Sequence, residues 1–362
     1  MTDFSNATHL SDMQIPESWA SYIIERSTAS NAFFQSGVVA DNTPAFHNLG
    51  TSGTTVNIPA FQPLEVADPQ VPTDTADLVL NKIKTDKFQA RKLGFDQAWS
   101  ATDLSRELSG ADPLGAIGDS IADYWNTIYE KVLLAELTGM FASTSMKGVN
   151  QLDVTSTQDP TFSLTNFNKA RFMLGDRYKD LALVVIHSDI LMQLQNANIV
   201  DPKTGATNTF VINGNANVPT SITAPDTGDS IKGVQIVVDD ALTKDASGKY
   251  NSYLFAKGAV SYVELPVENA VETGREPLIN HGVDYLINRR RFVMQPQGIS
   301  WNDTAFGADK EFPDLTDLAN GANWTKKFDN KLIPMVKFTT TDGAIITAST
   351  TAGTSTSSTS SK

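Results

Sequence analysis

The feature that most constrains the fold is a long apolar periodicity that opens within the stretch ELSGADPLGAIGDSIADYW, residues 107–125. Asp112 is a favourable N-cap residue and Pro113 a favourable first helical residue, so a helix is predicted to begin here. Apolar side chains then recur at spacings of three and four, at Leu114, Ile117, Ile121, Trp125, Ile128, Val132 and Leu133 or Leu134. Gly139 is a suitable C-cap, which predicts a helix over 113–138. At about 1.5 Å per residue this helix is a rod of roughly 39 Å, a structural beam.

The glycines at the start of this helix raise the alternative of a phosphate-binding loop. A Walker loop requires lysine after its last glycine, and Ala116 stands at that position. A dinucleotide fingerprint follows a buried strand, whereas the residues before Gly110 are the polar DLSREL. Gly115 and Gly118 instead lie inside the helix, where they permit close approach of another backbone. The stretch therefore predicts a structural helix and no nucleotide site.

Composition excludes several classes of function. The chain of 362 residues contains no cysteine, which excludes disulfides, thiolate metal sites and a cysteine nucleophile. Its start lacks the features of a signal peptide, and no apolar run reaches the ~20 residues that cross a bilayer. We therefore expect a soluble protein that is made in a cytoplasm and has no membrane partner. A net charge of −13 argues against nucleic acid as a tightly held ligand.

Residues 54–95 are predicted to form a long extended hairpin, with strands near 54–61 and 78–95. An isolated hairpin is marginal in water, so it has to pack on something, in this chain or in a neighbour. Its second strand carries a local excess of positive charge, at Lys82, Lys84, Lys87, Arg91 and Lys92. One interpretation is a solvated strand face with edge lysines, and another is a basic arm that docks on an acidic surface of another copy. Nucleic-acid binding is a poorer third, because Phe88 is the only aromatic residue in the run.

The rest of the chain mixes helical and strand patterns. A short helix is predicted at 16–29, a second at 161–178 and a third after the buried strand LALVVI (181–186), capped by Ser188. A polar loop follows at 203–230, and β-type segments follow at 233–240, 250–265 and 282–301. The mixture predicts an α+β fold without regular alternation. Twelve of the last sixteen residues are Ser or Thr, so 347–362 is predicted to be a disordered tail whose removal after Ile346 leaves folding intact.

Candidate chemistry is sparse. The four histidines show no metal-ligand spacing, and no cofactor motif is present. His187 and Ser188 adjoin Asp189, but adjacency in sequence is not the spatial arrangement of a catalytic triad. Asp239 and Asp240 are most simply a turn at a strand end, with a cation site as the alternative. The cationic cluster comprises Arg289, Arg290 and Arg291, with Arg275 and Glu276 upstream; it fits either pairing within a sheet or an ion-pair network between subunits.

Several segments, taken in order, resemble the major capsid proteins of tailed bacteriophages, which have the Hong Kong 97-type fold. TDLSRELSGADPLGAIGDSIADYWNTIYEKVLLAELTGMF (102–141) is similar to the region of the family's spine helix, and ARFMLGDRYKDLALVVIHSDILMQLQ (170–195) to its following helix, strand and helix. KGVQIVVDDAL (232–242), YLFAKGAVSY (253–262), VETGREP (271–277) and RRRFVMQPQGISW (289–301) are similar to its later strands. The resemblance rests on all of these segments occurring in the family's order, from about residue 16 to 301.

The resemblance implies pentamers and hexamers that close into an icosahedral shell around double-stranded DNA, with a scaffolding protein and a portal as partners. The virion is the implied location, and the host cytoplasm during assembly. The implied divisions are an N-terminal arm (1–53), an extended loop (54–95), a peripheral domain with the spine helix (96–185), a mainly axial domain (186–290), a return to the peripheral domain with the C-terminal region (291–346) and the tail (347–362).

Some relatives begin with a cleavable scaffolding segment. Only about 50 residues precede the first strand here, which favours a separate scaffolding protein. Some relatives also cross-link through a lysine of the extended loop, but no partner residue is identified in this chain. Two alternatives remain open: a shell of the same fold that holds enzyme cargo, and a soluble hydrolase centred on His187 and Ser188.

Overall fold

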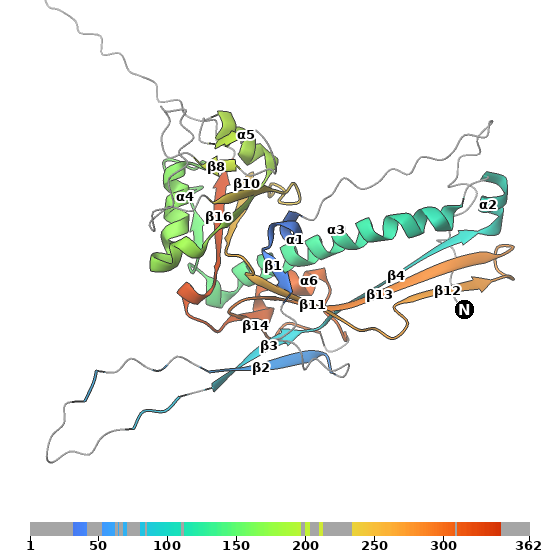
Figure 1. Ribbon diagram of the computed structural model, residues 1–362, viewed down its shortest axis with the longest axis horizontal. Helices are drawn as coiled ribbons and strands as arrows, with labels where there is room; N and C mark the ends of the chain where they lie inside the picture. Colours follow the sequence, from blue (N-terminus) through green and yellow to red (C-terminus); the bar gives the residue numbers. More distant parts are fainter. Residues whose placement is uncertain are drawn as a thin grey trace, which may run out of the picture.

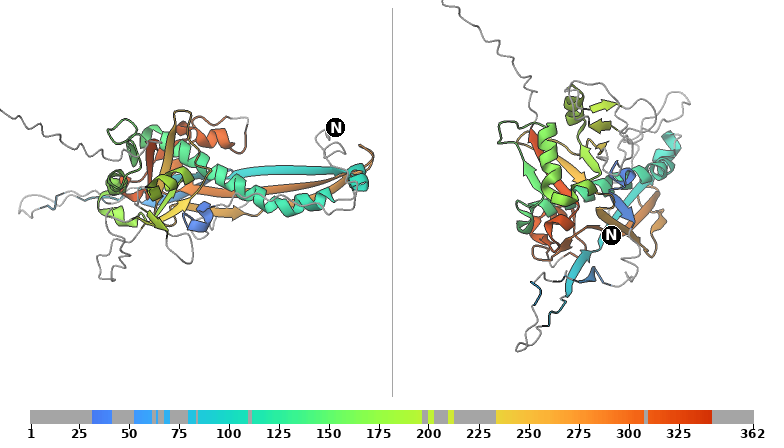
Figure 2. Two further views of the ribbon diagram at one scale, coloured as in Figure 1. Left: turned by 90° about the horizontal axis from the view of Figure 1, so that it is seen from above. Right: turned by 60° about the vertical axis from the view of Figure 1, so that its left-hand side comes forward.

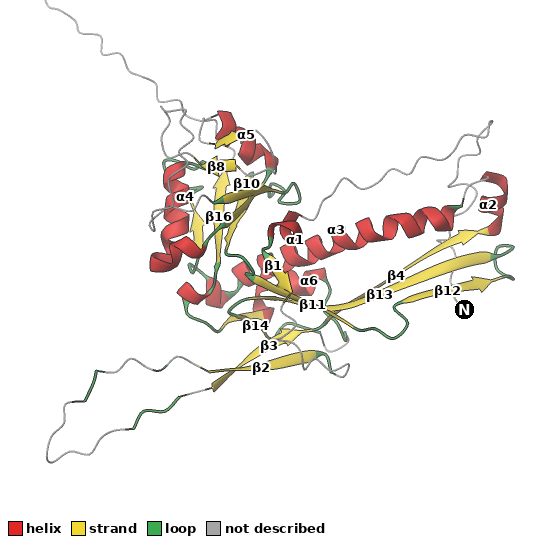
Figure 3. Cartoon of the chain, in the orientation of Figure 1, coloured by secondary structure: helices red, strands yellow, loops and turns green. Residues whose placement is uncertain are grey.

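The computed structural model describes residues 32–41, 53–61, 64, 68–70, 80–83, 85–109, 112–196, 200–202, 210–212, 234–307 and 310–341. The predicted helix at 16–29, most of the predicted loop at 203–230 and the tail at 347–362 lie outside these residues. Helix α3 (Pro113–Ala142) runs beside the long strands of one sheet, and a second sheet with its own helices forms a compact block at the other end (Figures 1 and 2). The fold is α+β, as predicted, with helices and strands interspersed (Figure 3).

Helix α3 begins as predicted but ends later. Asp112 occupies the N-cap position, although its side chain makes no capping hydrogen bond, and Pro113 is the first helical residue. The predicted end at Gly139 is wrong, because the helix continues to Ala142. A Cβ on Gly139 would overlap the carbonyl oxygen of Leu318 and lie 2.6 Å from Trp324 Nε1. The glycine therefore permits close packing against helix α6 (Leu315–Ala319).

The apolar side of α3 is buried unevenly. Trp125, Val132 and Leu133 are buried, whereas Ile117, Ile121 and Ile128 are half-buried. The expectation that Gly115 and Gly118 admit another backbone is not met among the described residues, where a Cβ on Gly118 would meet nothing within 4 Å. A Cβ on Gly115 would meet only the side chain of Asp112. The C-terminal half of α3 is thus the part that joins the core.

The sheet beside α3 is organised around β13 (Val283–Pro296), its longest strand. Strand β4 (Leu93–Thr102) pairs with β13 over Val283–Phe292. On the other edge, β12 (Val271–Glu276) and β11 (Val260–Leu265) pair with successive parts of β13, and β1 (Val39–Asp41) lies parallel to β11. Helix α2 (Asp103–Ser109) follows β4 at the far end of the sheet (Figure 1).

The second sheet has the order β5-β16-β10-β6-β9. Its strands are β5 (Gln151–Asp153), β16 (Met335–Thr341), β10 (Lys249–Phe255), β6 (Leu183–Ile186) and β9 (Gln235–Val238). Helix α4 (Leu164–Arg171) and a 3₁₀ segment (Phe172–Asp180) replace the predicted single helix at 161–178, because Gly175 has φ +61° and breaks it. Phe167, Ala170 and Leu174 are buried as their spacing predicts.

Helix α5 (Ser188–Asn196) follows β6 and corrects the prediction of a Ser188 cap. Ser188 is already the first helical residue. The capping acceptor is Nδ1 of His187, to which the Asp189 amide donates at 3.0 Å. Asp240 Oδ1 accepts from the Ser188 amide at 3.2 Å.

The sheet topology divides the chain differently from the expected boundaries. Strands β11 and β12 and most of β13 fall within the range expected to be mainly axial (186–290), yet they lie in the sheet beside α3. Strand β16 belongs to the range expected to return to the peripheral domain (291–346), yet it pairs with β10. Partners distant in sequence decide both assignments, and local patterns do not reveal such partners.

Three short pairs complete the described structure. β2 (Thr55–Phe61) and β3 (Thr85–Arg91) form the predicted hairpin, which projects away from the body (Figure 1), but β3 is shorter than the predicted strand at 78–95. β14 (Ile299–Trp301) pairs with β15 (Trp324–Lys326), and β7 (Val200–Pro202) with β8 (Phe210–Ile212). The other 3₁₀ segments of the described residues are Thr144–Met146, Gly321–Asn323 and Asn330–Leu332.

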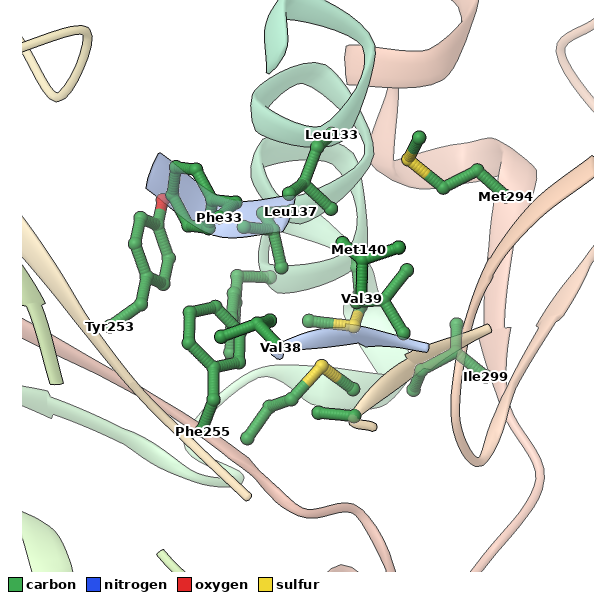
Figure 4. Packing of buried hydrophobic residues seen from close by; sticks show 14 of the residues in the cluster. Phe33, Val38, Val39, Leu133, Leu137, Met140, Tyr253, Phe255, Met294 and Ile299 are labelled. Atoms are coloured by element: carbon green, nitrogen blue, oxygen red, sulfur yellow. The ribbon is translucent and has the colours of Figure 1, made fainter. Parts of the chain in front are cut away.

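The main core lies where the two sheets meet the C-terminal half of α3. Helix α1 (Ala32–Ser36) and β1 supply Phe33, Val38 and Val39, which pack against Leu137 and Phe255 (Figure 4). A second cluster of buried residues joins α4 and α5 to the second sheet. A third, small cluster of Ala90, Val263 and Val293 packs the root of the projecting hairpin on the sheet beside α3.

Candidate assembly surfaces

The three successive arginines of β13 form ion pairs with three neighbouring strands. The pairs, each at 2.5 Å, are Arg289 with Glu272 of β12, Arg290 with Glu264 of β11, and Arg291 with Asp96 of β4. Planar guanidinium groups suit such contacts because they match the geometry of carboxylates. Within one chain the arginines therefore stabilise the sheet, and their role between subunits stays a prediction.

A second group of charges joins α2 to the β12–β13 hairpin. Arg275 pairs with Asp103 and, at 2.9 Å, with Asp284, while Arg106 pairs with Asp284 at 2.7 Å. The hydrogen bond from Arg275 lowers the pKa of Asp103, which keeps this carboxylate ionised. Glu276 is half-buried at the end of β12 and takes part in no ion pair with another described residue. The network holds the tip of the long sheet together.

The basic run of the hairpin is split between surface and interior. Lys82 is exposed, Lys84 lies outside the described residues, and Lys87 lies in β3 with its side chain outside the description. Arg91 and Lys92 were expected on an exposed arm, but both are buried. Burial lowers the pKa of Lys92. Of the described side chains in this run, Lys82 is therefore the one that is exposed.

Arg91 anchors the hairpin root to the body. It pairs with Asp303 at 3.1 Å and donates to the carbonyl oxygen of Glu311 at 2.9 Å, and its guanidinium lies 4.4 Å from the ring centroid of Phe306. Sequence reasoning missed these partners because they lie more than 200 residues away. The anchor gives the projecting hairpin a rigid base.

Large apolar side chains are exposed beyond this base. Leu64, Leu80 and Ile83 have exposed fractions of 65, 88 and 53%. Large apolar side chains that gather in one exposed patch are typical of a surface that contacts a partner. In the described residues, the hairpin thus exposes three large apolar side chains together with one cation, Lys82.

Helix α3 also carries buried carboxyl groups that the sequence analysis did not single out. Burial, followed by the hydrogen bond with Asp239, raises the pKa of Glu130 to about 8. Burial alone raises the pKa of Glu136 well above its ordinary value. Neither carboxylate oxygen of Glu136 has a hydrogen-bond partner among the described residues. Both residues lie within the apolar repeat of α3, and the spacing of that repeat does not indicate that carboxyl groups are buried there.

The arrangement around His187 does not form the proposed hydrolytic centre. The Nδ1 atom of His187 accepts from the Asp189 amide, and a hydrogen bond from the Ser188 side chain lowers the pKa of Asp240. A triad requires the serine hydroxyl to donate to the imidazole. These groups instead cap α5, and Tyr250 donates to Asp189 at 2.5 Å.

Two further kinds of site are absent from the described residues. No group of three or more His, Cys, Asp or Glu side chains there could hold a metal ion, so the described residues give Asp239 and Asp240 no third such ligand for a cation. No helix of the described part is both long and apolar enough to cross a membrane. The features that stand out are the projecting hairpin, the charged sheet and the beam-like helix.

Solved structures with the same arrangement come from phage capsids. The cyanophage Pam1 capsid asymmetric unit superposes with a TM-score of 0.53 at 12% identity, covering 94% of this chain and 99% of that chain. The capsid of Ralstonia phage GP4 gives a TM-score of 0.52 at 9% identity, covering 95% and 98% of the two chains. The fold is therefore the Hong Kong 97-type fold of phage capsids.

Sequence similarity then identifies the family. The major capsid protein of Bacillus phage SPP1 is 34% identical over 339 residues, which cover 91% of this chain and 97% of the relative. No family model matches the chain. The chain belongs to the major capsid proteins of tailed bacteriophages, and its role is structural.

Proposed function

We propose that this major capsid protein assembles through pentamers and hexamers into the icosahedral shell that encloses phage double-stranded DNA. The observation that carries the proposal is the relationship to the SPP1 major capsid protein, which extends over 97% of that protein. The negative net charge of the chain supports it, because an acidic protein attracts DNA weakly and suits a container that must not trap its contents.

The hairpin is the assembly element in this proposal. Its exposed Leu64, Leu80 and Ile83 are contact residues, and Lys82, Lys84 and Lys87 dock on acidic surfaces of a neighbour. The sheet beside α3 corresponds to the peripheral domain and the second sheet to the axial domain. The β13 arginines and Arg275, with Glu276, contribute to contacts between subunits in addition to their pairing within the chain. A scaffolding protein and a portal act as partners during assembly in the host cytoplasm.

The experiment that tests the proposal measures particle size. The purified, tag-free chain is examined by light scattering and negative-stain microscopy, with and without the co-expressed phage scaffolding protein. Closed shells or rings of five and six subunits are the expected result. A monomer under every condition would contradict the proposal.

A second candidate, a shell that holds enzyme cargo, shares the fold and predicts shells as well. The contents of native particles separate the two, since the capsid proposal requires double-stranded DNA inside. Protein cargo without DNA would favour the second candidate.

A further inference from the structure

A cationic groove lies at the junction of the two sheets. Its volume is about 1040 Å³, and it runs from the start of β6 and β9 to the loop that follows β15. Arg177, Lys179 and Lys257 line it, against a single carboxylate, that of Asp180. In a chain with a net charge of −13, a groove with this excess of positive charge is unusual.

The groove has an apolar part beside its charges. Phe328 and Leu332 line it with exposed fractions of 37 and 43%. Phe328 also stacks on Phe88 of β3, with ring centroids 5.9 Å apart, so the groove lies next to the root of the projecting hairpin. Arg177 pairs with Asp180 at 2.8 Å, whereas exposed Lys257 takes part in no ion pair with another described residue. The groove therefore suits an acidic, partly apolar peptide segment.

The chain contains a segment with the complementary chemistry. Residues 63–79, PLEVADPQVPTDTADLV, carry four carboxylates and no lysine or arginine. The carboxylates belong to Glu65, Asp68, Asp74 and Asp77. Three prolines in this segment restrict its backbone, which lowers the entropy lost when a peptide binds in extended form. Its leucines and valines match the apolar part of the groove.

A second copy, and not the same chain, is the source of this segment. Strands β2 and β3 project away from the body (Figure 1), and Leu64 and Leu80 at the borders of the segment are 65 and 88% exposed. We propose that the acidic limb of the extended loop, residues 63–79 of one copy, binds in the groove formed by Arg177, Lys179, Lys257, Phe328 and Leu332 of a neighbouring copy. This inference rests on the proposed function, because it requires neighbouring copies in a shell. The two limbs of the loop then make different contacts: the acidic limb binds the cationic groove, and the basic limb with Lys82, Lys84 and Lys87 docks on an acidic surface.

Cross-linking tests the proposal cleanly because the chain has no cysteine of its own. Lys257→Cys is combined in turn with Asp68→Cys, Asp74→Cys and Asp77→Cys, and assembled shells are treated with a short bis-maleimide. At least one pair is expected to convert most of the chain from the monomer band to dimers and higher multiples on a denaturing gel. The matched control replaces Lys257→Cys by Lys147→Cys, at an exposed lysine outside the groove, and is expected to remain monomeric.

Each outcome decides a separate point. Multiples from the Lys257 pairs but not from the Lys147 pairs support the proposal. A cross-linked monomer would show that the loop folds back on its own groove, and unlinked chains in intact shells would show that the groove is not the receptor. Either result overturns the proposal but leaves the capsid function standing. Absence of shells from the unaltered chain would instead contradict the proposed function.

A measurement on the unassembled subunit covers variants that fail to assemble. A labelled peptide of residues 63–79 is titrated into the unaltered subunit and into the Lys179→Glu, Lys257→Glu double variant. Binding to the unaltered subunit is expected to be at least tenfold tighter. Equal affinity for the two proteins would overturn the proposal.

Discussion

At the scale of single residues, the carboxyl groups of Glu130 and Glu136 contrast most with their surroundings. Both lie on the buried side of α3, where an ionised carboxylate is costly because it loses water. Burial raises the pKa of both groups, and for Glu130 the hydrogen bond with Asp239 adds to the effect. The folded subunit therefore retains protons that the unfolded chain releases.

This retention predicts how stability depends on pH. The pKa of Glu130 rises from 4.5 to about 8 on folding, so its contribution is complete below about pH 4.5 and is lost as pH rises through 8. Glu136 acts in the same direction. The free energy of unfolding of the unassembled subunit, measured by urea denaturation, is expected to fall between pH 5 and pH 8, and less steeply in Glu130→Gln.

Glu107→Gln is the matched control, because Glu107 is exposed on α2. Its pH profile is expected to follow that of the unaltered chain. A Glu130→Gln profile as steep as that of the control would show that the Glu130 carboxyl does not retain its proton in the fold.

Some residue-scale features were readable from the sequence and others were not. The pairing of β13 arginines with carboxylates was one of two interpretations, since the charge pattern alone does not say which chain supplies the partner. The burial of Arg91 was not predicted, because Asp303, Phe306 and Glu311 become its neighbours only in the folded chain. A local charge count treats a buried anchor and an exposed lysine alike.

At the scale of elements, α3 shows the same difference between local and distant information. Its start follows from Asp112 and Pro113, and its buried face follows from the apolar spacing, both of which are local signals. Its end at Ala142 depends on Leu318 and Trp324, which occupy the space beside Gly139. The division of the strands between the two sheets was missed for the same reason, since β16 pairs with β10 more than 80 residues earlier in the chain.

The packing at Gly139 leads to a paired prediction. Gly139→Ala is expected to lower the free energy of unfolding by about 1–3 kcal/mol, because the added methyl group overlaps the carbonyl of Leu318. Gly118→Ala, on the same helix but with open space around it, is expected to raise it by about 0.5–1 kcal/mol. Urea denaturation of the unassembled subunits measures both changes. Equal effects of the two substitutions would contradict the role assigned to Gly139.

At the scale of the whole molecule, the hairpin projects from a base that Arg91 fixes, and its apolar side chains remain exposed in the single chain. A subunit of this shape is incomplete without neighbours. Reversal of charge at Lys82, Lys84 and Lys87 to glutamate is therefore expected to leave the subunit folded but to reduce shell formation severely. Circular dichroism checks the fold and light scattering the assembly; normal shells from the triple variant would contradict basic docking.

The position of β16 within the second sheet bears on how the chain is made. Residues 335–341 lie between β5 and β10, so until residue 341 has been synthesised β5 lacks its partner strand and β10 has only β6 beside it. The first sheet likewise cannot form until β13 has been synthesised, because its other long strand, β4, lies more than 180 residues earlier in the chain. Such long-range pairings fold late and slowly. A chain that ends before residue 335 therefore cannot complete the second sheet.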